Sequence, residues 1–294
     1  MKLKDWIAFL LLGALSSASF LWIKIVVAEV APFTLVGLRV LLGALTAGAA
    51  AIIGRAAWPR SLAGWVPYIV LGVTSVALPF LLIAWGERTI PSAVASILNA
   101  TQPLFTVLLA SLVLRDDRLT VPRLIGVLVG FAGVVVLLSG DLQPGAGASW
   151  LGQAAVIGAA FFFAASSIYA RRATAGAPGL VLGAAPMLAA SLVAWAVIPA
   201  VESPVRLPAL PGTWVALLCL GALATGLTTI LWYYLLHAVG PTRAALVTYF
   251  FPLGGVLLGV VFLGETLTWQ ILAGAGLIVA SLAVVNWKAR VNKT

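Results

Sequence analysis

A row of polar side chains interrupts an apolar stretch in the first half of the chain. Its members follow i, i+4, i+7 and i+11 spacing, which places them on one face of a helix: Ser92, Ser96, Asn99 and Pro103. Gln102 lies close to the same face. An unpaired amide in hydrocarbon costs roughly 2–7 kcal/mol, so Asn99 and Gln102 face either a polar cavity or a neighbouring helix. Pro103 favours the cavity, because a proline leaves a main-chain carbonyl one turn earlier without its helical partner.

Hydroxyl-bearing and aromatic residues in other apolar stretches are candidates for the rest of the cavity wall. They are Ser16, Phe20, Thr74, Trp85, Phe162, Ser166, Thr225, Trp232, Thr248 and Tyr249. Apolar walls with a few hydroxyls, amides and rings suit an amphipathic or aromatic small molecule better than a phosphate or a sugar nucleotide. Two alternatives stay open. Serines in membrane helices often bond their own main chain, and Trp85 and Trp232 could belong to the aromatic belt at a membrane surface.

Arg39 lies inside an apolar stretch, where a charge is costly. Its guanidinium could reach outward to the surface, pair with Glu29, or face a pathway and attract a carboxylate. Lys24, Glu87 and Glu265 lie near the ends of stretches, where we expect their side chains to reach the membrane surface. No carboxylate is expected deep in the membrane, which favours facilitated diffusion, or ion coupling through a residue nearer the surface such as Glu87.

The composition explains why membrane helices must position these residues. Of 294 residues, 63% are hydrophobic and 9% charged, and the mean hydropathy is +1.15, so lipid must be the main solvent. A helix needs about 20 apolar residues to cross the hydrocarbon core. Ten runs qualify, near 5–25, 31–54, 62–85, 91–114, 120–139, 149–170, 177–199, 211–236, 241–263 and 267–287. They lack the two-residue alternation of a membrane barrel, so we predict an all-α integral membrane protein.

The positive charges indicate how the chain crosses the membrane. The net charge of +9 does not indicate nucleic-acid binding, because the basic residues are spread among the joints and form no basic face. If the N-terminus is cytoplasmic, thirteen Lys and Arg residues fall on the inner side and three on the outer side, Lys24, Arg88 and Arg206. This bias predicts that both termini are cytoplasmic.

The two halves of the chain repeat the same pattern. Residues 91–126 recur as 241–274: Pro103 corresponds to Pro252, and each is followed by leucine. Five predicted spans per half is an odd number, so the second half must enter the membrane from the opposite side. The prediction is a pair of five-helix inverted repeats, with a substrate site near the midplane between them and alternating access as the mechanism. The expected division is residues 1–140, a linker at 141–148, and residues 149–294.

Enzymatic function is not indicated by the residues available. Catalysis inside a membrane needs a nucleophile with a base, or metal ligands, at helix depth. The chain has one histidine, His237, one cysteine, Cys219, and no pair of carboxylates within the predicted spans. We therefore expect no catalytic residue, no metal site and no cofactor. Pro79, Pro103 and Pro252 are instead candidate hinges within the helices.

Two stretches resemble EamA-type members of the drug/metabolite transporter superfamily. Phe20-Leu-Trp-Ile-Lys24 followed by Pro32 and Leu38-Arg39 is similar to the start of that family's repeat, and Leu263-Gly-Glu-Thr-Leu-Thr268 is similar to its end. The resemblance implies ten spans in two inverted repeats and export of small metabolites. There are two departures: Ala14-Leu-Ser-Ser-Ala-Ser19 replaces a Trp-Gly-Ser-Asn-like start, and Asp116-Asp117 replaces Gly-Glu.

Within that superfamily the chain is most similar to bacterial exporters of aromatic amino acids and metabolites. We therefore expect an inner-membrane exporter of small amphipathic metabolites, amino acids among them. The alternatives are a carrier of nucleotide sugars or phosphate esters, which would favour two or more basic residues at the cavity, and a proton-coupled drug exporter. The expected partners are the metabolite and membrane lipids, with no nucleic acid. Small-residue spacing at Gly126/Gly130 and Gly255/Gly259 favours packing within one chain, hence a monomer or a weak homodimer.

Overall fold

The fold was analysed in a computed structural model that describes residues 2–113, 120–139, 149–240 and 244–287. Asp116, Asp117 and the predicted linker 141–148 lie outside the described residues. The first half contains α1 (Leu3–Val27), α2 (Pro32–Ile53), α3 (Leu62–Leu71), η1 (Gly72–Ala77), α4 (Leu78–Gly86), α5 (Ser92–Asn99), α6 (Gln102–Val113) and α7 (Val121–Ser139). The second half contains α8 (Ser149–Ala173), α9 (Gly179–Val201), α10 (Pro211–Leu218), η2 (Cys219–Leu227), α11 (Thr228–Val239), η3 (Ala245–Tyr249), α13 (Phe250–Leu263) and α14 (Trp269–Trp287).

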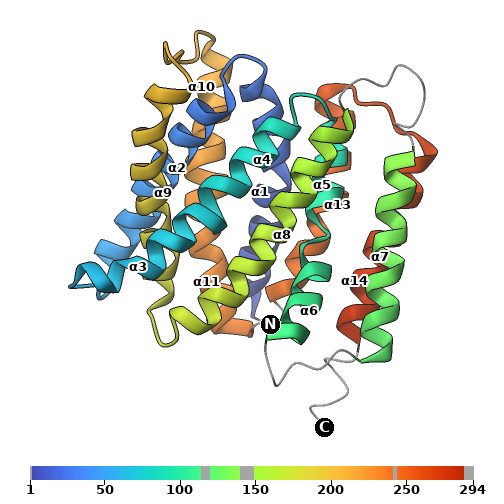
Figure 1. Cartoon of the computed structure of the whole chain (residues 1–294), viewed down its shortest axis with the longest axis horizontal. Helices are drawn as coiled ribbons and strands as arrows, with labels where there is room; N and C mark the ends of the chain where they lie inside the picture. The colour runs from blue at the N-terminus through green and yellow to red at the C-terminus, as the bar shows by residue number, and fades with distance from the viewer. Residues whose placement is uncertain (1, 114–119, 140–148, 241–243, 288–294) are drawn as a thin grey trace.

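These elements form ten helical segments (Figure 1). Helices α3, η1 and α4 are continuous, as are α10, η2 and α11, and two further pairs abut, α5 with α6 and η3 with α13. In the described part of the chain, nine helices are long and apolar enough to cross a membrane, and Trp269–Val285 of α14 is a shorter apolar helix. The predicted all-α membrane fold of ten helices is therefore confirmed.

The two halves run through the bundle in opposite directions. Asp5 near the start of α1 accepts a hydrogen bond from Tyr234 near the end of α11 (2.8 Å), and Arg172 at the end of α8 donates to the Val113 carbonyl at the end of α6. We call this side the N-terminal face; α14 also ends there (Figure 1). We call the opposite side, where α1 ends and α8 begins, the distal face. The structure thus agrees with the predicted inverted repeat.

The repeats pack against each other through two equivalent wide turns. The π-helical segment η1 packs on α9, and its counterpart η2 packs on α2. A Cβ at Gly72 in η1 would lie 2.7 Å from the Pro186 carbonyl oxygen, and one at Gly221 in η2 would lie 2.5 Å from Leu42 Cβ. Glycine is therefore required at both close approaches.

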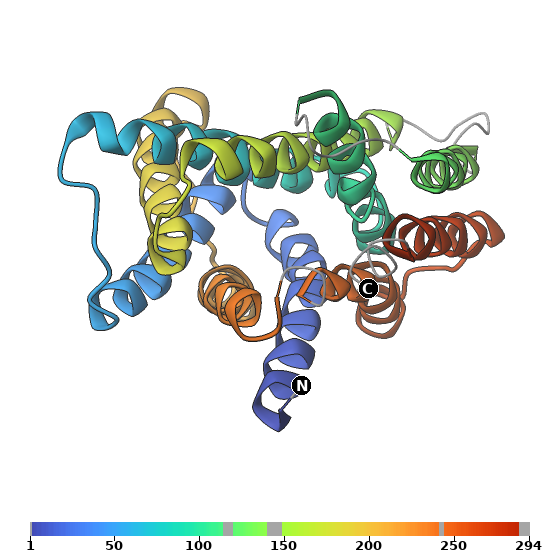
Figure 2. The same ribbon diagram turned by 90° about the horizontal axis from the view of Figure 1, so that it is seen from below.

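Helix α7 pairs with α14 at one end of the bundle (Figure 2). A Cβ at Gly126 would lie 2.7 Å from Val285, and one at Gly130 would lie 2.2 Å from Leu104. Gly255 is equally close to Ser96, so these small-residue positions serve packing within one chain, as predicted.

Helix breaks coincide with all three predicted hinge prolines. Helix α5 ends at Asn99 and α6 begins at Gln102, directly before Pro103. Pro79 follows η1, where the Leu78 N–H reaches back to the Val73 carbonyl, five residues earlier. Pro252 stands in the first turn of α13, after the 3₁₀ turn η3. Since proline cannot donate a main-chain hydrogen bond, each break accommodates a missing donor.

Candidate functional site

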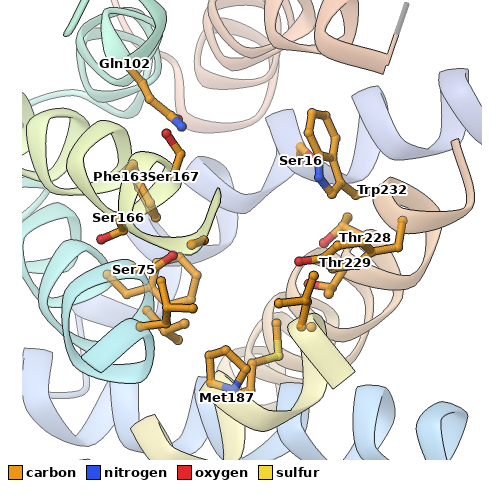
Figure 3. A pocket seen from close by; sticks show the side chains of 18 of the residues that line it. Ser16, Ser75, Gln102, Phe163, Ser166, Ser167, Met187, Thr228, Thr229 and Trp232 are labelled. Carbon is orange, nitrogen blue, oxygen red and sulfur yellow. The ribbon is translucent and has the colours of Figure 1, made fainter. Parts of the chain in front are cut away.

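A cavity of about 620 Å³ lies between the two repeats. Its wall comes from both repeats, chiefly from α1, η1, α4, α8, α9 and α11, with Arg39 from α2 (Figure 3). At one end it reaches Arg171 and Leu236 near the N-terminal face, and at the other it stops at buried Ile23 and Ile83. The cavity is therefore open toward the N-terminal face and closed toward the distal face.

Arg39 lies at the closed end of the cavity. Its Nε–H donates to Thr225 Oγ1 at 2.9 Å, and its guanidinium carbon lies 3.6 Å from the centre of the Phe80 ring. The side chain is 4% exposed, and within the described residues its Nη1 has no hydrogen-bond partner. Arg39 is thus held by a ring and a hydroxyl, and both N–H bonds of its Nη1 group remain without a partner among the described residues.

Arg39 does not pair with Glu29, and that alternative was wrong. The Glu29 carboxylate instead accepts hydrogen bonds from the Ala209 and Leu210 N–H groups at the start of α10. Those N–H groups have no helical partner of their own.

The break between α5 and α6 presents two amides to the cavity. Asn99 ends α5 and Gln102 begins α6, and both line the wall. Asn99 is 5% exposed, and among the described residues its Oδ1 has no hydrogen-bond partner. Figure 3 shows Gln102 and Ser167 pointing toward each other at one side of the cavity. Both amide residues therefore border the cavity.

The structure brings seven predicted residues to the wall: Ser16, Phe20, Arg39, Asn99, Gln102, Ser166 and Trp232. Two others stand directly behind it. Thr225 holds Arg39, and Thr74 Oγ1 accepts a hydrogen bond from Ser166 at 3.0 Å. Both threonines also donate to main-chain carbonyls of their own helix.

The remaining predicted residues do not line the cavity. Trp85 is 41% exposed on the outside of the bundle, and Phe162 packs against Phe161 with 5.9 Å between ring centres. Ser96 is fully buried against Gly255 of α13. Tyr249 packs on the cluster around Leu104, and Thr248 is likewise outside the lining.

Local features of the helices explain why Trp85 and Ser96 do not line the cavity. The prediction for Trp85 assumed a regular helix, but the π turn η1 widens the helix and rotates everything after it, so Phe80 and Ile83 face the cavity instead. The prediction for Ser96 assumed one continuous face through Asn99. Helix α5 ends at Asn99, and its earlier turns pack on α13.

The sequence reasoning missed Ser75, Phe80, Thr228 and Met187, all of which line the cavity. Neighbouring threonines at the start of α11 were the available signal for Thr228, since two hydroxyls in an apolar run need polar surroundings or their own main chain. The signal for Phe80 depends on the π turn, which local spacing does not reveal.

Lys24, Glu87 and Glu265 do not reach outward to the membrane surface, and this prediction was wrong. The Lys24 ammonium donates to the main-chain carbonyls of Glu87 (2.5 Å) and Ile90 (2.8 Å). The Glu265 carboxylate accepts the N–H groups of Ser92 (2.6 Å) and Ala93 (2.9 Å) at the start of α5. The Glu87 side chain is fully buried.

Three glutamates close the distal face by capping helices of the opposite repeat; we call Glu29, Glu202 and Glu265 the distal glutamates. Glu202 accepts the Phe33 N–H (2.9 Å) and the Thr34 N–H (2.8 Å) at the start of α2. Glu29 from the first repeat caps α10, and Glu265 from the second caps α5. Each carboxylate meets the positive end of a helix dipole. The closed distal face is thus held by bonds between the repeats.

Comparison with known proteins identifies the repeat. The model of the EamA-like transporter family matches the chain twice, over residues 4–139 and 150–287. A protein of Salmonella typhimurium named as a probable amino-acid metabolite efflux pump is 30% identical, covering 100% of this chain and 98% of its own length. A probable terminal-alkyne amino-acid exporter of Streptantibioticus cattleyicolor is 27% identical over 75% of this chain and 73% of its own. One crystal structure at 23% identity shares the fold, with a TM-score of 0.70 and full coverage of both chains.

Proposed function

The chain belongs to the EamA-like transporter family, and from that premise we propose that it exports amino acids, including aromatic ones, through the cavity. The substrate class rests on a single observation, the incomplete hydrogen bonding of the buried Arg39 guanidinium at the cavity. A buried guanidinium whose Nη1 amino group has no partner, at the closed end of a cavity, is suited to receive one carboxylate.

The rest of the wall suits the other parts of an amino acid. Among the described lining residues none is acidic, so the ligand's cationic group would meet neutral acceptors such as the Asn99 amide oxygen. Phe20, Phe163 and Trp232 offer ring surfaces for an apolar or aromatic side chain. A volume of about 620 Å³ lies within the usual size range of small-molecule sites.

Two relatives support the same substrate class by name, since one is a probable amino-acid metabolite efflux pump and the other a probable amino-acid exporter. A nucleotide sugar or phosphate ester fits less well, because only Arg39 and Arg171 are basic among the lining residues and they lie at opposite ends of the cavity. A cationic drug fits less well for the opposite reason, since no acidic side chain lines the described wall.

The proposed transport cycle is alternating access between the units 1–140 and 149–294. We assign the N-terminal face to the cytoplasm of a bacterial inner membrane, in line with the excess of Lys and Arg at that side. The present conformation would then load substrate from the cytoplasm. Breaking the bonds of the distal glutamates would open the opposite side, with Pro79, Pro103 and Pro252 as the proposed hinges.

A flux panel in proteoliposomes tests the substrate class. Labelled phenylalanine, tryptophan, leucine and a nucleotide sugar are compared in vesicles with and without purified protein. The proposal expects flux of the amino acids above the protein-free level and none of the nucleotide sugar. Flux of the nucleotide sugar alone would reject it.

A further inference from the structure

Glu87 is a buried acidic residue that the proposed transport path does not use. It directly follows the last residue of α4 and is 0% exposed. Within the described residues neither oxygen of its carboxyl group has a hydrogen-bond partner. An ionised carboxylate without partners in such a place is strongly disfavoured, whereas a protonated one is tolerated.

None of the charged groups around Glu87 donates a hydrogen bond to its carboxyl group within the described residues. Lys24 from α1 donates to main-chain carbonyls, one of them that of Glu87 itself. Arg39 from α2 is held by Thr225 and the Phe80 ring. Glu265, from the segment between α13 and α14, brings a further negative charge.

The other neighbours place no further charge beside the Glu87 carboxyl group. Helix α8 packs there through Gly152, whose added Cβ would lie 2.9 Å from the Gly86 carbonyl oxygen, and its next residue is the neutral Gln153. Arg88, next in the chain, is exposed. Burial raises the pKa of the Glu87 carboxyl well above its usual range; Lys24 and Arg39 lower it in part, and Glu265 raises it further.

Glu265 lies in the same region, but its carboxyl group has hydrogen-bond donors. Both of its oxygens accept main-chain N–H groups of α5, at 2.6 and 2.9 Å. Glu87 has no such donors. Two glutamates close enough to influence each other therefore have different surroundings: the Glu265 carboxyl group has two main-chain donors, and the Glu87 carboxyl group has none within the described residues.

We call the closed distal face, held by the distal glutamates, the distal seal. Glu87 lies within it, between the central cavity and the distal surface. The central cavity ends at Ile83, one helical turn before Glu87. A second hollow, on the distal face, is lined by Lys24, Leu210 and Glu265 among others. Opening the seal would join these spaces and bring water to Glu87.

We propose that Glu87 is a proton-binding site within the distal seal, occupied while the seal is closed and exchanging its proton with the solution at the distal face when the seal opens. Closing the seal then takes up one proton. Lowering the pH at the distal face favours closure, by up to about tenfold per pH unit between the ordinary carboxyl value and the raised one.

Infrared spectroscopy of the purified protein tests whether the proton is present, without reference to any substrate. At neutral pH the unaltered protein should show the C=O stretch of a protonated carboxyl group, and Glu87→Gln should lack it. Asp5→Asn, which removes a carboxyl group at the opposite, N-terminal face, is the control and should retain the band. An identical carboxyl region in the unaltered protein and in Glu87→Gln would overturn the proposal.

A second measurement follows the consequence in proteoliposomes. The initial flux of a transported amino acid is recorded while the pH is varied only at the distal face. The unaltered protein should show a flux that changes with this pH, and Glu87→Gln, which imitates the permanently protonated form, should show at least a tenfold smaller change. The same pH profile in both proteins would overturn the proposal even if the flux itself supports the transport function.

Discussion

Arg39 in the first repeat is held by Thr225 in the second, through an Nε–H···Oγ1 bond of 2.9 Å. The threonine lies in the π-helical segment η2, and its hydroxyl donates a hydrogen bond to the Leu220 carbonyl at 2.8 Å. The proposed carboxylate receptor is therefore assembled across the repeat interface. A rocking motion of one repeat against the other would change its geometry, which links ligand binding to the conformational cycle.

Replacing Arg39 should remove most of the affinity for a carboxylate. A hydrogen bond to a charged group contributes about 1.5–3 kcal/mol, so Arg39→Gln should lower the initial flux at subsaturating amino acid by roughly 10- to 100-fold. Arg88→Gln makes the same charge change at an exposed position and serves as the control. Equal fluxes in the two variants would remove Arg39 from the binding site.

The Asn99 amide at the end of α5 should affect the flux, whereas the exposed Trp85 side chain should not. Asn99→Ala removes an unpartnered oxygen from the cavity wall and should lower flux about 2- to 10-fold, the value of one ordinary hydrogen bond. Trp85→Ala alters a side chain outside the cavity and should leave flux per folded protein unchanged. The reverse order of effects would contradict the lining described here.

The glycines of the two wide turns should be sensitive to one added methyl group. At Gly72 and Gly221 a Cβ would lie 2.7 and 2.5 Å from α9 and α2, and overpacking of this kind typically costs about 1–3 kcal/mol. Gly48→Ala is the matched control, since nothing lies within 4 Å of its added Cβ. Thermal unfolding in detergent should show lower midpoints for Gly72→Ala and Gly221→Ala only. A similar loss in Gly48→Ala would point to a general effect of helix glycines.

The cap made by Glu29 should depend on pH. The Thr213 hydroxyl and the Ala209 and Leu210 N–H groups lower the pKa of the Glu29 carboxyl below its ordinary value of 4.5. A lowered pKa means that the contribution to stability is present above the ordinary value and is lost as the pH falls through the lowered one. Glu29→Gln should therefore be less stable than the unaltered protein at neutral pH and should approach it in strong acid. A stability difference that stays constant with pH would contradict this account of the cap.

The sequence predicted the architecture well because long apolar runs and an odd number of spans per repeat leave few alternatives. Asn99, Gln102 and Arg39 were found for a related reason, since a polar group in an apolar helix must have a polar neighbour.

Phe80 lines the cavity in place of the predicted Trp85 because a π turn alters the helical period. No single residue type marks such a turn. The burial of Glu87 and the caps made by the distal glutamates were missed because both depend on contacts between repeats, more than 160 positions apart for the pairs Thr34–Glu202 and Ser92–Glu265.

Competition in proteoliposomes tests the central claim most directly. The flux of labelled phenylalanine is measured alone, with excess unlabelled phenylalanine, and with excess phenylalanine amide, which lacks the carboxylate. The account predicts flux above protein-free vesicles that phenylalanine suppresses and the amide does not. Equal suppression by both competitors, or no flux above the protein-free level, would contradict it.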